Sequence, residues 1–192
     1  MSTPSGARYV GPYTILHSKP IYENQWLKLR EDRVQRLGGE ESVFSVVAMR
    51  PGVTVLAMED DGDVYLVREF KYGIGQETLE AVSGTIESGE SPEVAGLREL
   101  SEETGLIASE WIDMGVINPF TTIVNSPNHT FLARRLSRAR RAPQAGEKLE
   151  AAKMPFDDAL RAVLRGEITH AASCVLILKT QLFLEKERKG RR

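Results

Sequence analysis

The sequence predicts an α/β fold in which helices flank a mixed β-sheet, with an antiparallel β-sheet extension at the N-terminus. Three observations support this prediction. Strand-length apolar runs stand on both sides of a clearly delimited helix at residues 91–104. Two helical patterns close the chain, and short alternating runs fill its beginning. We therefore divide the chain into a β-rich extension, residues 1–49, and a main domain, residues 50–192.

The N-terminal extension contains three runs with the alternation of half-exposed strands. They are Tyr13 to His17, Trp26 to Val34 and Ser42 to Met49, the last two separated by a Gly38-Gly39 turn. Residues up to about Gly11 are small and polar, and we expect the start of this segment to be mobile. These runs form either a separate antiparallel sheet or an edge hairpin of the main domain.

The main domain has strand patterns before and after its first helix. Those before it are Val53 to Met58, Val64 to Phe70 and Thr78 to Val82. Those after it are Trp111 to Asn118, Asn128 to Leu136 and Lys148 to Met154. The periodicity then changes to that of amphipathic helices, which we place at Phe156 to Arg165 and Thr169 to Glu187, with Gly166 between them.

The first helix has clear start and stop signals. Ser91 can cap the helix N-terminus with its hydroxyl, and Pro92 suits the first helical position because its missing N–H would have no partner there. Gly105 accepts the left-handed conformation that ends many helices. The apolar residues expected to face the core are Val94, Leu97 and Leu100.

Three carboxylates lie close together on this helix. Glu99, Glu102 and Glu103 stand at positions i, i+3 and i+4, which share one stretch of helix surface. Such charges repel one another unless a cation lies among them, and oxygen ligands of this kind suit Mg²⁺ or Mn²⁺. The alternative is a solvated acidic face on which Arg98 pairs with Glu102.

Composition narrows the functional class. The 192 residues are 41% hydrophobic and 27% charged with a net charge of −2, as in an ordinary globular protein without the basic signature of nucleic-acid binding. A single cysteine provides no disulfide framework. No apolar run has the length of a membrane span, and the N-terminus lacks the layout of a signal peptide, so we expect a cytoplasmic protein.

The segment from Gly84 to Leu106, GTIESGESPEVAGLRELSEETGL, fits the pattern G-x5-E-x7-R-E-U-x-E-E-x-G-U at every defined position, where U is apolar. This is the Nudix box, and the chain resembles the Nudix hydrolase family. The complete pattern favours the metal site over the solvated acidic face. The resemblance also implies the Nudix fold, an α/β/α sandwich.

The resemblance extends over nearly the whole chain. The run YLVREFKYGIGQETLEAVSG, and the late order of strand, helix, Gly166-Glu167-Ile168 and helix, look like the ADP-ribose pyrophosphatase branch. That branch hydrolyses nucleoside diphosphates linked to a sugar, giving a nucleoside monophosphate and a sugar phosphate. Its members are typically homodimers whose N-terminal sheets cross between subunits, which implies a dimerisation role for the hairpins before Arg50.

The resemblance assigns the metal ligands by position. It implies that Glu99 and Glu103 are the principal ligands, that Glu102 binds the metal or its water, and that the carbonyl of Ser83 is a main-chain ligand. A further acidic ligand comes from a late loop, where Glu147 is the best match and Glu150 the reserve. The competing interpretation of Glu147 is a surface glutamate.

The resemblance also implies the groups that act on substrate. Arg50 and Lys71 fall where the branch contacts the nucleotide or diphosphate, and Lys71 replaces an arginine, which loses the planar fork. Thr85 stands at a substrate-contact position. Arg98 belongs to the catalytic motif and is expected, with Glu90, to hold the loop against the helix. The general base is Glu103 or Glu147.

One departure concerns the terminal sugar. The branch usually carries a Ser-Pro-Gly turn and a following glutamate after the box, whereas this sequence has Phe120-Thr121-Thr122 and Ser126.

Two rival functions remain open. A nucleoside triphosphate hydrolase would not need the long N-terminal extension, and a non-catalytic nucleotide sensor would tolerate the loss of box carboxylates, all of which are present.

Overall fold

The computed structural model describes residues 8–139 and 150–190, and the chain forms two compact units. The first unit comprises Met1–Arg50 and Phe120–Ser126. The second comprises Pro51–Pro119 and Pro127–Arg192. The segment 120–126 thus leaves the second unit to join the first, so each unit is described separately.

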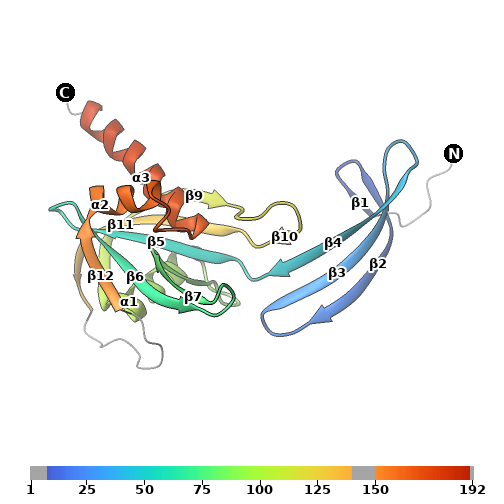
Figure 1. Ribbon diagram of the computed structural model, residues 1–192, viewed down its shortest axis with the longest axis horizontal. Coiled ribbons are helices and arrows are strands. Elements are labelled where there is room, and N and C mark those ends of the chain that lie inside the picture. Colours follow the sequence, from blue (N-terminus) through green and yellow to red (C-terminus); the bar gives the residue numbers. More distant parts are fainter. Residues whose placement is uncertain (1–7, 140–149, 191–192) are drawn as a thin grey trace. The chain divides into compact units, whose positions relative to one another are not determined.

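The first unit is a five-stranded sheet in the order β1-β2-β3-β4-β10 (Figure 1). Its strands are β1 (Arg8–Val10), β2 (Tyr13–Glu23), β3 (Leu27–Gln35), β4 (Glu41–Met49) and β10 (Val124–Asn125). The first four are antiparallel, as predicted, whereas β10 runs parallel to β4. Strand β1 shows that regular structure begins at Arg8, within the segment whose start was expected to be mobile. Gly11 has a φ of 54°, which permits the tight turn that returns β2 onto β1.

The second unit contains a seven-stranded sheet. Its strands are β5 (Gly52–Met58), β6 (Asp63–Lys71), β7 (Gln76–Glu80), β8 (Val82–Thr85), β9 (Leu106–Ile117), β11 (Asn128–Arg138) and β12 (Glu150–Pro155). The main order is β12-β6-β5-β11-β9, with β7 paired to β6 and β8 to β5. Strand β11 runs parallel to β5 and antiparallel to β9, so the sheet is mixed, as predicted.

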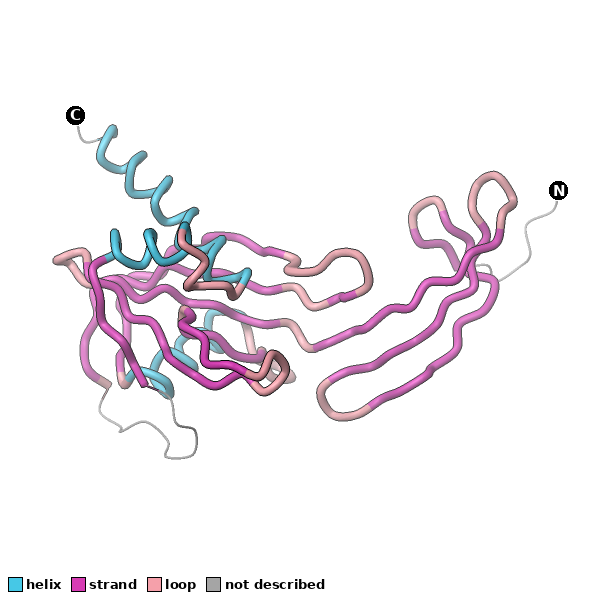
Figure 2. The backbone as a smooth tube through the Cα atoms, in the orientation of Figure 1, coloured by secondary structure: helices cyan, strands magenta, loops and turns pink. Residues whose placement is uncertain are grey.

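Helices cover both faces of this sheet (Figure 2). They are α1 (Pro92–Thr104), α2 (Phe156–Leu164) and α3 (Ala171–Gly190). Alternate residues of β5 point to opposite layers: Val53 and Val55 pack in the cluster that includes α1, and Leu56 packs in the cluster that includes α2 and α3. The predicted α/β/α sandwich is confirmed. None of the helices within the described residues is long and apolar enough to cross a membrane.

Helix α1 has the predicted ends, but its buried face agrees with the prediction only in part. The hydroxyl of Ser91 accepts a hydrogen bond from the Val94 N–H, and Gly105 adopts a φ of 68°. Leu100 is buried, as expected, whereas Val94, also expected in the core, is 53% exposed, and Ala95 and Gly96 are buried in addition. A Cβ on Gly96 would lie 3.2 Å from atoms of Trp111 and Val55, so the helix approaches the sheet through its smallest residues.

The predicted strand from Thr78 to Val82 is two strands instead of one. The chain changes partner at Ala81, since β7 pairs with β6 and β8 pairs with β5. The pairing with β5 sets Ser83 opposite Thr54 and Gly84 opposite Val53. Ser83 and Gly84 thereby come to lie beside the helix that follows them.

Candidate active site

Gly84 and Glu99 meet at the junction of β8 and α1. A Cβ on Gly84 would lie 1.9 Å from Oε1 and 2.0 Å from Cδ of Glu99, far closer than non-bonded atoms approach. The Glu99 carboxylate therefore occupies the space that any other residue at position 84 would fill. This close approach explains why the first position of the motif is a glycine.

Arg98 holds the loop between β8 and α1 against the helix. Its Nε and Nη2 donate to the two oxygens of Glu90, both at 3.0 Å, and Nη2 also donates to the Thr85 carbonyl at 3.0 Å. Its Nη1 donates to Glu99 at 2.7 Å and to Glu102 at 3.2 Å. The paired hydrogen bond to Glu90 is the main reason that the pKa of Arg98 is raised. One guanidinium thus connects three carboxylates and a backbone carbonyl.

Glu103 differs from its neighbours in protonation. Burial raises its pKa from the usual 4.5 to about 8, and the nearby charge of Glu99 adds to this effect. Lys71 and the Ser83 N–H act in the opposite direction but do not cancel it. Burial also raises the pKa of Glu99, which Arg98 partly offsets. A cation near these two groups would replace the proton on Glu103 and relieve the repulsion.

The donor set has the chemistry of a hard-cation site. The carboxylates of Glu99, Glu102 and Glu103 and the backbone oxygen of Ser83 offer oxygen atoms, the kind of ligand that Mg²⁺ prefers. Among the described residues, no three acidic, histidine or cysteine side chains converge in metal-binding geometry. The hydrogen bonds of Arg98 to Glu99 and Glu102 explain this, because they direct both carboxylates to the guanidinium. A bound cation would compete with Arg98 for them.

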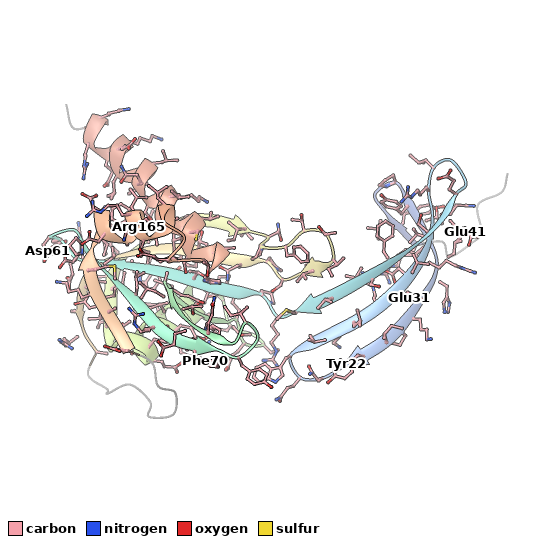
Figure 3. The ribbon with its side chains drawn as sticks, viewed as in Figure 1. Tyr22, Glu31, Glu41, Asp61, Phe70 and Arg165 are labelled. Carbon is pink, nitrogen blue, oxygen red and sulfur yellow. The ribbon has the colours of Figure 1, made fainter. Side chains whose placement is uncertain are left out.

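Lys71 lies at the end of β6, after Phe70, which Figure 3 labels. Its ammonium group bonds Glu69 and lies 3.8 Å from Oε2 of Glu80. Burial would lower the pKa of Lys71, but Glu69, Glu80 and Glu103 together outweigh burial and raise it. Lys71 therefore remains an ammonium ion, and it lies close enough to Glu103 to interact with that carboxyl group when it is ionised.

The remaining predicted site residues are Arg50, Glu147 and the reserve candidate Glu150. Arg50 belongs to the first unit, where it lines a pocket with Trp26 and Met49. Glu147 lies outside the described residues. The reserve candidate, Glu150, begins β12 opposite Arg68. The structure thus brings Ser83, Thr85, Arg98 and the three glutamates together, with Lys71 close by.

Two residues beside Lys71 were not predicted from sequence. Glu80 and His170 line, with Lys71 and Ser83, a pocket of about 590 Å³. Glu80 is 7% exposed, although a strand glutamate is usually solvated. His170 precedes α3 and stands ninety positions away from Glu80 in the chain, so spacing carried no signal for their contact. The position of Glu80 within an apolar strand pattern was the one feature of the sequence that could have indicated its burial.

Comparison with known proteins agrees with this architecture. Residues 48–173 match the family model described as the NUDIX domain, and residues 13–47 match the nucleoside diphosphate sugar hydrolase N-terminal domain. An ADP-ribose pyrophosphatase of Bacillus subtilis (strain 168) is 30% identical over 170 residues, which cover 84% of this chain and 89% of that protein.

Two further proteins extend the comparison. An ADP-ribose pyrophosphatase of Mycobacterium tuberculosis (strain ATCC 25618 / H37Rv) is 27% identical over 169 residues, covering 86% of this chain and 82% of the relative. The crystal structure of an ADP compounds hydrolase superposes with a TM-score of 0.80 at 20% identity, covering 94% of this chain and 98% of the other, which shows the shared fold. With its motif complete and its main domain matched along most of its length, the chain belongs to the Nudix family of hydrolases.

Proposed function

We propose that the protein hydrolyses the diphosphate bond of a nucleoside diphosphate linked to a sugar, giving a nucleoside monophosphate and a sugar phosphate. The observation that carries this proposal is the packing of Glu99 against Gly84 beside the partly buried Glu103, in a chain whose first unit matches the N-terminal domain of nucleoside diphosphate sugar hydrolases. The names of the two bacterial relatives make ADP-ribose the first substrate to test.

The cation of this reaction would be held by Glu99, Glu102, Glu103 and the Ser83 carbonyl, with Glu147 as a further ligand. Mg²⁺ is the expected ion and Mn²⁺ a substitute. When bound, it supplies charge neutralisation of the diphosphate and activation of water. Arg98 keeps the carboxylates and the Thr85 segment in place.

The remaining side chains act on water and substrate. Glu103 or Glu147 accepts the proton of the attacking water. Lys71 and Arg50 bind phosphate oxygens, and Thr85 contacts the substrate beside the metal loop. The segment Thr121-Thr122, which replaces the Ser-Pro-Gly turn, lines a pocket of the first unit together with the charged residues Arg30 and Asp32 and with apolar residues such as Phe44.

The protein works as a homodimer in this proposal, and we place it in the cytoplasm. Val34 is the one buried apolar side chain among the described residues of the first unit. Tyr22, labelled in Figure 3, is 56% exposed and Trp26 is 59% exposed. A sheet with so little core of its own needs a partner to cover it, and a second copy is the commonest one. Removal of residues 1–47 should convert a dimer into a monomer in sedimentation, whereas a truncated dimer would refute this role.

The substrate class is tested by product analysis. ADP-ribose, ADP-glucose, GDP-mannose, NADH, a diadenosine polyphosphate and a nucleoside triphosphate are incubated with the protein and Mg²⁺, with chelator as control. Turnover of a nucleotide sugar to two monophosphates supports the proposal. Release of pyrophosphate from the triphosphate alone would support the rival hydrolase. Binding of a nucleotide sugar without turnover would support the sensor.

A further inference from the structure

Lys71 is held by carboxylates from two strands. Glu69, two residues earlier on β6, bonds its ammonium group, and Glu80 on the neighbouring β7 lies 3.8 Å away. At that distance Glu80 attracts the ammonium without forming a hydrogen bond. Lysine has three N–H donors. One is directed to Glu69, which leaves two for other acceptors, such as the oxygens of a diphosphate.

Glu80 is in turn fixed by the residue at the start of α3. Nδ1 of His170 lies 3.2 Å from Oε2 of Glu80, the same oxygen that faces Lys71. The Glu80 side chain is only 9% exposed, so its charge is poorly screened by water. Its position therefore has a strong influence on the position of Lys71.

The ring of His170 is oriented by α3 itself. Its Nδ1 lies 2.9 Å from Oγ of Ser173, a fully buried residue. That Oγ accepts a hydrogen bond of 2.8 Å from the N–H of Ala81, where the chain passes from β7 to β8. Nδ1 of His170 also faces Oε2 of Glu80, a carboxylate oxygen that can only accept, so we assign the ring proton to Nδ1, which donates to Glu80 and to the Ser173 Oγ. The chain of contacts thus runs from the helix, through His170 and Glu80, to Lys71.

We propose that Glu80 and His170 are positioning residues that hold the Lys71 ammonium at the edge of the cation site, ready to bind a phosphate oxygen. This inference rests on the proposed function. It assigns a task to two residues that lie outside the motif from Gly84 to Leu106 and that do not themselves touch the substrate. A purely structural tie between α3 and β7 is the competing explanation of the same contacts.

A double-mutant cycle separates positioning from structure. The variants are Glu80→Gln and His170→Ala, each made alone and together with Lys71→Met, and the measurement is calorimetric titration with inorganic pyrophosphate in Mg²⁺. We expect each single variant to weaken binding about tenfold, and to weaken it no further once Lys71 is replaced. Lys71→Arg, which keeps the charge, should retain most of the affinity. Lys153→Met, which removes a surface pair with Asp63 at 3.2 Å, is the matched control and should bind as the wild type does.

Kinetics supply a second readout with the best substrate of the panel. Glu80→Gln and His170→Ala should raise KM more than they lower kcat, because the group that they position binds phosphate. Equal losses of affinity with and without Lys71 would overturn the proposal, as would single variants without effect. Where His170→Ala or Glu80→Gln does not fold, His170→Asn and Glu80→Asp enter the same cycle.

The two hypotheses fail in different ways. A wild type that binds pyrophosphate but splits no substrate refutes the proposed function, while the binding cycle still decides the role of Glu80 and His170. A wild type that turns over nucleotide sugars but gives an additive cycle refutes only the positioning role. A wild type that does not bind pyrophosphate overturns the positioning role at once.

Discussion

Replacing Glu103 with glutamine should raise the free energy of unfolding of the metal-free protein and should abolish its Mg²⁺-dependent turnover. The folded-state pKa of Glu103 is about 8, against the usual 4.5. Between these values the folded protein retains a proton that the unfolded chain releases, so the free energy of unfolding falls as the pH rises through this window. At pH 7 this cost is about 3 kcal/mol. Glutamine does not ionise and avoids it.

The measurement is thermal unfolding in chelator from pH 4 to pH 9. Wild type and Glu103→Gln should unfold at similar temperatures near pH 4 and diverge as the pH rises. At pH 7 the variant should unfold roughly 6–12 °C higher, given about 2–4 °C per kcal/mol for a chain of this size. Saturating Mg²⁺ should stabilise the wild type far more than the variant, since the cation replaces the proton on the carboxyl.

A matched control uses the same substitution on the same helix. Glu93 is exposed in the first turn of α1, so Glu93→Gln should change stability by less than about 1 kcal/mol. If Glu103→Gln follows the wild-type curve at every pH, Glu103 is not the buried, proton-binding group described above. If the variant also keeps full Mg²⁺-dependent turnover, its place in the metal site is wrong.

Three further substitutions test other parts of the site. Gly84→Ala should fold normally, because the flexible Glu99 side chain can move aside. Its kcat should fall about 100-fold, because the Glu99 carboxylate is displaced. A kcat equal to that of the wild type would contradict the close contact between Gly84 and Glu99. Arg98→Lys cannot reproduce the forked bonds to Glu90 and should lower the free energy of unfolding in urea by about 1–3 kcal/mol; an unchanged midpoint would argue against the clamp. Glu147→Gln should lower kcat by about 10²–10⁴-fold if this residue is the base or a ligand, and an unchanged rate returns it to the surface.

Local signals were enough to predict the ends of α1. Ser91 and Pro92 act on the first turn of the helix and Gly105 acts on the last, so their effects can be predicted from neighbouring residues in the sequence. The buried face of α1 could be predicted only in part. Val94 is more apolar than Gly96, but Gly96 is the residue that is buried, because it allows the helix to approach Trp111 closely. Which face of the helix is buried depends on the shape of the sheet against which it packs, and that shape is set by the tertiary structure.

Contacts between distant segments were also beyond the sequence. The expected strand from Thr78 to Val82 changes partner at Ala81, whose N–H is bonded by Ser173, 92 positions later. Pairing of Arg98 with Glu90 followed from the motif, but the backbone oxygen of Thr85 has no sequence signature. The resemblance predicted Lys71, while its partners Glu80 and His170 became visible only in the fold.

Isotope transfer from water tests the central claim most directly. Wild-type protein, Mg²⁺ and ADP-ribose are incubated in ¹⁸O-enriched water, and the products are analysed by mass spectrometry. The account predicts AMP and ribose 5-phosphate in equal amounts, with one ¹⁸O in one of the two phosphates and no products in chelator or with Glu103→Gln. Formation of ADP and free ribose, or hydrolysis that continues without a divalent cation, would contradict it.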